Sequence, residues 1–177
     1  MARGGKGSQA ETYVVEQICL LPGWNARNAN DTTINQPGFD VVATNEAMGR
    51  KILVSVKSVS QDGARQDYGI GSSFERHRAD IYAFVDMTGE RPGPVCLAGA
   101  DTIVELAKAR HRKYQTDRGR PDSLNSWSPK ISRGLLEAMG ALDAWHILDH
   151  PAPNAWPPLT DELLSHARSD APRSLGT

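Results

Sequence analysis

The chain has 177 residues, of which 39% are hydrophobic and 23% are charged. This length and composition are typical of one globular domain and exclude a disordered chain. The net charge of -1, from 20 basic and 21 acidic residues, excludes a uniformly basic surface, so any nucleic-acid-binding surface has to be local.

The sequence shows no sign of secretion or of membrane insertion. Cys19 and Cys96 each lie in an apolar run, and we expect both to be buried, reduced thiols. The basic segment 1–6 is not followed by an apolar stretch of signal-peptide length, and no apolar run reaches transmembrane length. We therefore expect a cytoplasmic protein with no membrane partner.

The first third of the chain predicts one helix followed by a polar connection. Residues 1–7 are rich in glycine, and we expect a flexible N-terminus there. Apolar residues at helical spacing predict a helix from Ser8, with Ser8 as N-cap and Glu11 completing a capping box. Residues 22–23, Pro-Gly, end this helix. The Asn-rich segment 24–37 is expected to be a loop or a short strand.

Segments rich in β-branched residues come next. The expected strands are 39–44, 52–59, 80–87 and 95–98, and the first two form an antiparallel hairpin closed by the turn at 45–50. The glycine-containing polar segment 60–78 is expected to be a long loop, and loops of this length in a compact domain are often functional.

The remaining elements are mainly helical. We expect a helix at 101–114, a polar loop at 115–129, a mostly helical segment at 131–145, a Pro-rich stretch at 151–158 and a short helix at 160–167 before a loose tail. This order predicts an α/β domain over residues 8–150, in which a central mixed β-sheet is flanked by helices. Residues 151–177 are interpreted as a Pro-rich C-terminal extension.

Two charged residues stand out in the predicted hairpin. Asp40 and Lys57 each lie in an otherwise apolar strand. Because side chains alternate along a strand, Ser55 and Lys57 share one face, and Ile52, Val54 and Val56 form an apolar core face. A carboxylate beside a lysine can help to hold a divalent cation and activate water. The alternative is a partly buried Asp–Lys ion pair, or the solvated face of a hairpin.

Three short segments surround these residues in a fixed order. They are Gly7-Ser8-Gln9-Ala10-Glu11 in the first helix, Pro37-Gly38-Phe39-Asp40-Val41-Val42-Ala43 in the first hairpin strand, and Val54-Ser55-Val56-Lys57-Ser58 in the second. Their order and spacing resemble the PD-(D/E)XK nuclease superfamily, especially its small resolvase-like and restriction-like members. The resemblance covers about residues 7–98, and each motif is short, so its specificity comes from order and spacing.

The resemblance implies a restriction-endonuclease-like fold and metal-dependent hydrolysis of phosphodiester bonds by a DNA endonuclease. It implies Mg²⁺ or Mn²⁺ as cofactor, Glu11 and Asp40 as metal ligands, and Lys57 as the catalytic lysine that orients or deprotonates the attacking water. Hard carboxylate oxygens are the ligands that magnesium prefers. The implied partner is nucleic acid, as double-stranded DNA, and a homodimer is expected by analogy alone.

Ser55 departs from the family pattern, because it occupies the position of the second acid. A neutral hydroxyl is a weaker magnesium ligand than a carboxylate. Three interpretations stay open. Glu11 or Glu16 supplies the missing charge; Ser55 acts through water while Asp40 and a backbone carbonyl bind the metal; or the site is inactive and the fold serves as a nucleic-acid-binding or assembly module.

Two polar regions contain candidate nucleic-acid contacts. The candidates are Arg65, Tyr68, Arg76 and Arg78 in the first region, and Arg112 and Lys113 in the basic segment 108–120 of the second. Arginine and lysine side chains bind phosphates, and a tyrosine ring stacks on a base. The alternative is a solvated loop and a solvated helix face.

Overall fold

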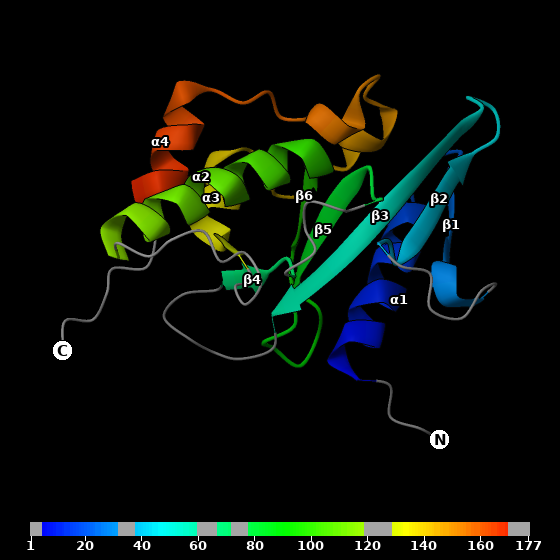
Figure 1. Ribbon diagram of the computed structural model, residues 1–177. Helices are drawn as coiled ribbons and strands as arrows, with labels where there is room; N and C mark the ends of the chain where they lie inside the picture. Colours follow the sequence, from blue (N-terminus) through cyan, green and yellow to red (C-terminus); the bar gives the residue numbers. More distant parts are fainter. Residues whose placement is uncertain (1–4, 32–37, 60–66, 72–77, 119–128, 170–177) are drawn as a thin grey trace.

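The computed structural model describes residues 5–31, 38–59, 67–71, 78–118 and 129–169 (Figure 1). Its helices are α1 (Lys6–Cys19), α2 (Ala100–Arg118), α3 (Arg133–Ala138) and α4 (Asp161–Ser169). Its strands are β1 (Asn25–Asn28), β2 (Val41–Asn45), β3 (Arg50–Val59), β4 (Asp67–Gly69), β5 (Ile81–Asp86), β6 (Val95–Gly99) and β7 (Lys130–Ser132). Short 3-10 helices are η1 (Ala29–Asp31), η4 (Trp145–Asp149) and η5 (Pro153–Ala155).

A mixed sheet of five strands forms the centre of the fold, as predicted. Its strand order is β1-β2-β3-β5-β6, and β4 and β7 form a separate two-stranded sheet. β3 and β5 are parallel, whereas all other pairs are antiparallel. The predicted hairpin is confirmed as β2–β3, with Val41 opposite Val54 at its open end.

Helices cover both faces of this sheet (Figure 1). On one face, α1 packs against the strands through its buried residues Ala10, Val14 and Ile18. The predicted core face of β3 is confirmed there, because Ile52, Val54 and Val56 belong to the same buried cluster. On the other face, α2 and α3 bury a second cluster against β5 and β6, and α4 packs against α2. The domain is therefore a three-layer α/β/α arrangement.

The start of α1 differs from the prediction. The helix begins at Lys6 with Gly5 as its N-cap, so Ser8 lies inside the helix and the predicted capping box is wrong. The Ser8 carbonyl instead accepts a hydrogen bond from the Thr12 hydroxyl at 3.0 Å. Glu11 therefore has no capping role, and its side chain is available for the site described below.

Two further predictions fail after β3. The segment expected to be a loop contains β4, which pairs with β7 in the second sheet. The helix expected over 131–145 is reduced to the six residues of α3. Ser132 caps α3 by accepting a hydrogen bond from the Leu135 N–H, and Gly140, at φ 72°, turns the chain away just beyond its end.

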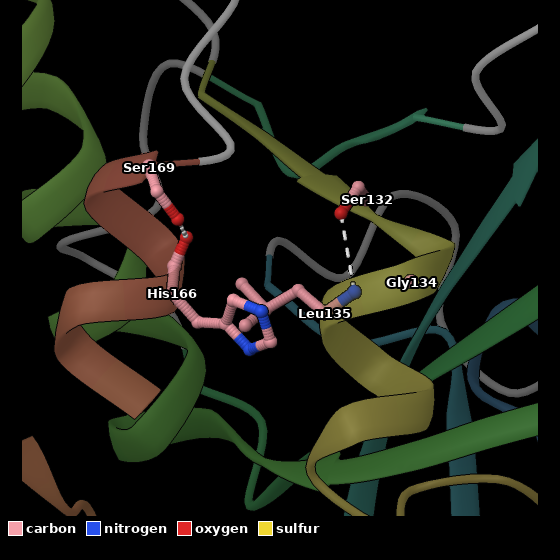
Figure 2. A pocket seen from close by; sticks show the side chains of 5 residues that line it. All are labelled: Ser132, Gly134, Leu135, His166 and Ser169. Atoms are coloured by element: carbon pink, nitrogen blue, oxygen red, sulfur yellow. Dashed lines mark hydrogen bonds between the residues drawn. The ribbon is translucent and has the colours of Figure 1, made fainter. Parts of the chain in front are cut away.

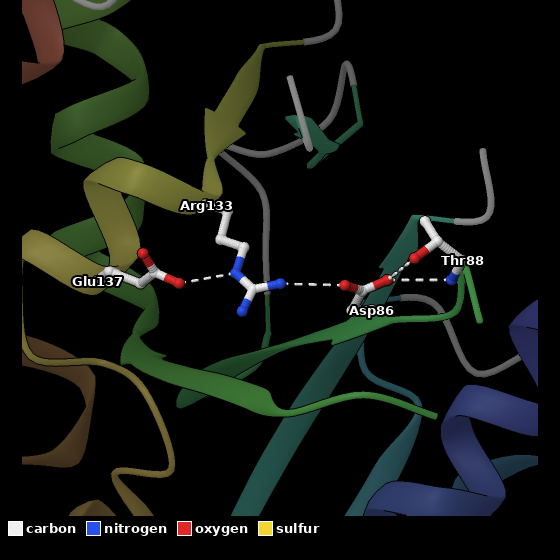
Figure 3. A network of polar contacts seen from close by, with 4 residues as sticks. All are labelled: Asp86, Thr88, Arg133 and Glu137. Carbon is white, nitrogen blue, oxygen red and sulfur yellow. Dashed lines mark hydrogen bonds and ion pairs between the residues drawn. The ribbon is translucent and has the colours of Figure 1, made fainter. Parts of the chain in front are cut away.

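A polar network holds α3 against the end of β5 (Figure 3). Arg133 forms ion pairs with Asp86 at 3.0 Å and with Glu137 at 2.7 Å. The other carboxylate oxygen of Asp86 accepts hydrogen bonds from the backbone N–H and the hydroxyl of Thr88, at 3.0 and 2.6 Å. Every charged group drawn in this network has a partner, so we assign it a structural role.

The segment after η4 is attached to the sheet. The Gly99 N–H donates to the Trp156 carbonyl at 2.6 Å, and the Thr102 hydroxyl donates to the Pro157 carbonyl at 3.0 Å. Both cysteines are free thiols, but Cys19 is exposed and only Cys96 is buried, so the prediction of burial is wrong for Cys19. In the described part of the chain, no helix has the length and apolar character needed to cross a membrane.

Candidate functional site

The site lies where β3 extends beyond its neighbour β2. β2 pairs with the first half of β3 and stops at Val41, whereas β5 pairs with the second half from Val54 onward. On the side that β2 leaves, no strand among the described residues pairs with residues 55–59 of β3. We call residues 55–59 the open edge of β3. α1 runs alongside and contacts β3 (Figure 1).

Asp40 occupies the beginning of this open edge. It lies one residue before β2, and its backbone N–H donates to the Val54 carbonyl at 2.8 Å. Its carboxylate Oδ2 accepts a hydrogen bond from the Val56 N–H at 2.6 Å and one from the Ser55 hydroxyl at 3.2 Å. The carboxylate thus accepts the hydrogen bond that the Val56 N–H would otherwise make to a neighbouring strand. No donor among the described residues binds the other oxygen, Oδ1.

Glu11 approaches the same edge from α1. Its side chain is partly buried and makes no hydrogen bond or ion pair with the described residues. Burial raises the pKa of the Glu11 carboxyl, the negative charge of Asp40 raises it further, and the positive charge of Lys57 lowers it. Because their charges act on the Glu11 carboxyl, Asp40 and Lys57 lie in its neighbourhood, and we treat the three residues as one candidate group.

Lys57 lies on the open edge and is partly buried. Among the described residues it forms no hydrogen bond and no ion pair within 4.0 Å, with Asp40 or any other carboxylate. The alternative of a closed Asp40–Lys57 ion pair is therefore wrong. A lysine held near two carboxylates without a direct partner leaves its ammonium group able to bind an anion.

The floor of the site is buried and neutral. Ser55 is 4% exposed, and in the register of β3 and β5 it lies opposite Tyr82, which is 2% exposed. Burial raises the pKa of Tyr82 to about 12, with a smaller contribution from the negative charge of Asp40. Tyr82 therefore stays protonated at neutral pH, and the charged groups of the site among the described residues are Glu11, Asp40 and Lys57.

Glu11 and Asp40 are the two carboxylates of the candidate group. In the part of the chain that the structure describes, no group of three or more His, Cys, Asp or Glu residues could hold a metal ion. Magnesium often keeps several waters and binds proteins through only one or two carboxylates. Glu11 and the unoccupied Oδ1 of Asp40 can provide those two ligands. Glu16 is exposed, and nothing in the structure links it to the site.

Asp80 repeats the structural part of the Asp40 arrangement. It lies one residue before β5, and its Oδ2 accepts a hydrogen bond from the Leu53 N–H at 2.7 Å. Its backbone N–H donates to the Leu53 carbonyl at 2.8 Å. Sequence reasoning missed this pair, although an aspartate directly before an apolar strand occurs at both positions. Asp80 can therefore serve as a control for the structural contribution of an aspartate that accepts a hydrogen bond from a β3 backbone N–H.

The candidate nucleic-acid contacts separate into distinct groups. Tyr68 is 1% exposed and packs edge-on against Phe84 with ring centroids 5.2 Å apart, so its ring is not available to a base. Arg78, Arg112 and Lys113 are exposed. The remaining two candidates, Arg65 and Arg76, lie outside the described residues.

The basic segment of α2 is less accessible than its sequence indicates. Arg110 is 1% exposed and donates to the Lys130 carbonyl, and its guanidinium is 4.0 Å from Asp67. His111 is 7% exposed, and Lys108 pairs with Glu105 at 2.8 Å. α2 lies on the sheet face opposite α1, so this segment does not share a layer with Glu11 (Figure 1).

A cavity of about 310 Å³ lies elsewhere, between α3 and α4 (Figure 2). Its lining residues are Ser132, Gly134, Leu135, His166 and Ser169. Both hydroxyls already take part in helix hydrogen bonds: Ser132 accepts from the Leu135 N–H at 3.2 Å, and Ser169 donates to the His166 carbonyl at 2.9 Å. Both hydroxyls are thus engaged by backbone groups of the helices, so we do not interpret this cavity as a catalytic site.

Comparison with known proteins adds no assignment. No family model matches the chain, and no curated protein or solved structure matches it.

Proposed function

We propose that this chain is a metal-dependent endonuclease of the PD-(D/E)XK type, which hydrolyses phosphodiester bonds in double-stranded DNA. The observation that carries the proposal is the grouping of Glu11, Asp40 and Lys57 at the open edge of β3 without a closed ion pair. A purely structural charge cluster is expected to pair its charges, as Arg133 does with Asp86 and Glu137.

Each side chain has a chemical role in this proposal. Glu11 and the Oδ1 atom of Asp40 bind Mg²⁺ or Mn²⁺, and the ion supplies Lewis acidity for polarising the phosphodiester. Lys57 binds a non-bridging phosphate oxygen and orients the attacking water. Water forms a bond to phosphorus and releases one proton to solvent, the P–O bond to the sugar breaks, and the departing oxygen takes up a proton from solvent.

Ser55 and the Val56 N–H orient Asp40. Their two hydrogen bonds fix Oδ2 and leave Oδ1 for the metal ion. In this proposal Ser55 is a positioning residue that holds a ligand, and Glu11 provides the second negative charge. Of the three interpretations of Ser55, the proposal adopts the one in which Glu11 supplies the missing charge. The Ser55 hydroxyl then acts indirectly, through its hydrogen bond to Asp40.

A nucleic-acid-binding or assembly module without activity is the second candidate. Two observations favour it: the serine at the position of the second acid, and the structural hydrogen bond from Val56 to Asp40. This candidate predicts DNA binding without cleavage and without a saturable magnesium or manganese site. Titration calorimetry with Mn²⁺ therefore separates the two functions.

The test of the proposal is a cleavage assay on supercoiled, linear and branched DNA. The full chain is incubated with Mg²⁺, or with EDTA, and compared with the Asp40→Asn and Asp80→Asn variants. We expect Mg²⁺-dependent cleavage by the wild type and by Asp80→Asn, and none by Asp40→Asn. No cleavage of any substrate by folded wild-type protein, or equal cleavage by Asp40→Asn, would overturn the proposal.

A further inference from the structure

Two chain segments approach each other next to the site. The first leads through Gly38 into Asp40 and β2, and the second leads through Arg78 into Asp80 and β5. A Cβ atom added at Gly38 would lie 3.2 Å from both the backbone N and the Cβ atom of Arg78, and 3.3 Å from its Cγ atom. The two segments are therefore in direct contact, two residues before each aspartate.

The two aspartates explain this contact. Asp40 binds the Val56 N–H and Asp80 binds the Leu53 N–H, so both segments are fixed to the middle of β3 by carboxylate hydrogen bonds. Gly38 has φ 101°, a backbone conformation that residues with a side chain rarely adopt. Because Gly38 has no Cβ atom, the Arg78 backbone can approach it closely. Arg78 is thus anchored beside the strand entry that carries Asp40.

Lys57 is the one basic side chain in the group formed with Glu11 and Asp40 among the described residues. The proposed metal ion uses the two carboxylates, so a second phosphate needs a basic side chain of its own. Arg78 is exposed, and its side chain makes no hydrogen bond or ion pair with the described residues. An arginine guanidinium binds phosphate oxygens with two parallel hydrogen bonds.

From this juxtaposition we infer that Arg78 binds a backbone phosphate of the nucleic acid next to the one at Lys57. Arg78 positions the substrate and does not take part in bond cleavage. The inference rests on the proposed function and deepens it, because it names the residue that holds the substrate beside the site. It also distinguishes Arg78 from Arg112, an exposed residue of α2 for which nothing in the described part of the chain shows a contact with the strand entries beside the site.

The test measures DNA binding and cleavage separately. Binding of a short fluorescent duplex is measured by anisotropy in EDTA, over a series of salt concentrations, for wild type, Arg78→Ala, Arg78→Lys and Arg168→Ala. Arg168 is a matched control, because it is an exposed arginine on α4, far from α1 and β3 (Figure 1). Cleavage kinetics are then measured with Mg²⁺ for the same proteins.

Arg78→Ala is expected to weaken binding roughly tenfold, because a charge-assisted hydrogen bond is lost. The slope of log affinity against log salt should fall by about one unit, as for the loss of one phosphate contact. In cleavage, KM should rise while kcat changes little, and Arg78→Lys should recover part of the affinity. Arg168→Ala should behave like the wild type.

The outcomes distinguish the two claims. If the wild type cleaves DNA and Arg78→Ala matches Arg168→Ala in affinity, salt slope and KM, the role of Arg78 is wrong and the proposed function stands. If Arg78→Ala lowers kcat without raising KM, Arg78 acts in the chemical step and the positioning role is wrong. If folded wild type neither binds nor cleaves DNA, the proposed function fails, and the role of Arg78 fails with it.

Discussion

The carboxylate of Asp40 accepts a 2.6 Å hydrogen bond from the backbone N–H of Val56. This contact gives Asp40 a structural duty at the open edge of β3 in addition to its proposed role as a metal ligand. The two duties use different oxygen atoms, Oδ2 and Oδ1, so substitutions can separate them.

Asp40→Ala should destabilise the fold, whereas Asp40→Asn should largely preserve it. Alanine leaves the Val56 N–H without its acceptor, which costs about 1–3 kcal/mol for a buried group. Asparagine retains an acceptor oxygen but loses the charge that holds a cation. Urea unfolding measures the first effect, and calorimetric titration with Mn²⁺ measures the second.

Asp80 provides the control for this experiment. Asp80→Ala removes an equivalent hydrogen bond to the Leu53 N–H, so it should destabilise the fold by a similar amount. Asp80→Asn should bind Mn²⁺ like the wild type. Equal loss of Mn²⁺ binding in Asp40→Asn and Asp80→Asn would show that metal binding does not depend on Asp40 specifically.

Ser55→Asp should strengthen metal binding, because it adds the acid that the resemblance leads one to expect. The Ser55 hydroxyl lies 3.2 Å from Asp40 Oδ2, so a carboxylate there adds negative charge beside a proposed ligand. Without metal, the like charges repel in a buried setting and lower the melting temperature. Mn²⁺ should then raise the melting temperature of Ser55→Asp more than that of the wild type.

Ser55→Asn is the matched control, because it has a similar size and no charge. An unchanged thermal response of Ser55→Asp to Mn²⁺, equal to that of Ser55→Asn, would argue against a cation at this position. Thermal scans with Mn²⁺ and with EDTA give the comparison directly.

Glu11→Gln should raise stability at neutral pH in the absence of metal. Burial and Asp40 raise the pKa of the Glu11 carboxyl, so the folded chain holds this proton more tightly than the unfolded chain. As pH rises from the ordinary pKa of glutamate through the raised pKa, the wild type therefore loses stability. The glutamine variant, which has no proton to lose, should not show this loss.

Melting temperatures of the two proteins as a function of pH, in EDTA, test this expectation. Glu16→Gln serves as the control, because Glu16 is exposed on the same helix. A glutamine variant at position 11 that is less stable than the wild type at neutral pH would mean that the Glu11 charge is favourably paired.

Gly38→Ala should destabilise the fold and displace the segment that leads into Asp40. The added Cβ atom meets the Arg78 backbone at 3.2 Å, and φ is 101°. Backbone strain of this kind costs about 1–3 kcal/mol, which urea unfolding can measure. Gly49→Ala is the control, since Gly49 has φ 60° but no atom within 4 Å of the added Cβ atom. A smaller effect at Gly38 than at Gly49 would contradict the close contact.

The sequence predicted the parts of the fold that depend on local patterns. Alternation in β3 identified the buried face of Ile52, Val54 and Val56, and the hairpin with β2 followed from two β-branched segments. The same alternation placed Ser55 and Lys57 on one face, and the hairpin placed Asp40 in the neighbouring strand. These features depend on a period of two residues, which is readable in a single strand.

Features that depend on tertiary contacts were not predictable in this way. Ile131 lies in β7 because it pairs with Tyr68 from a distant segment, so an apolar run that suggests a helix becomes a strand. Ser8 looks like an N-cap, but the N-cap is Gly5, three residues nearer the N-terminus. The contact between Gly38 and Arg78 joins residues 40 positions apart, and no local pattern indicates it.

The most direct test of the central claim is single-turnover cleavage of supercoiled DNA with Mg²⁺ by Lys57→Ala and Lys51→Ala. Lys51 lies on the same strand as Lys57, but it is exposed and remote from the open edge. We expect Lys51→Ala to cleave at the wild-type rate. Lys57→Ala should keep the fold and cleave at a rate reduced by a factor of about 100 or more. Cleavage by Lys57→Ala at the wild-type rate would contradict the proposed site.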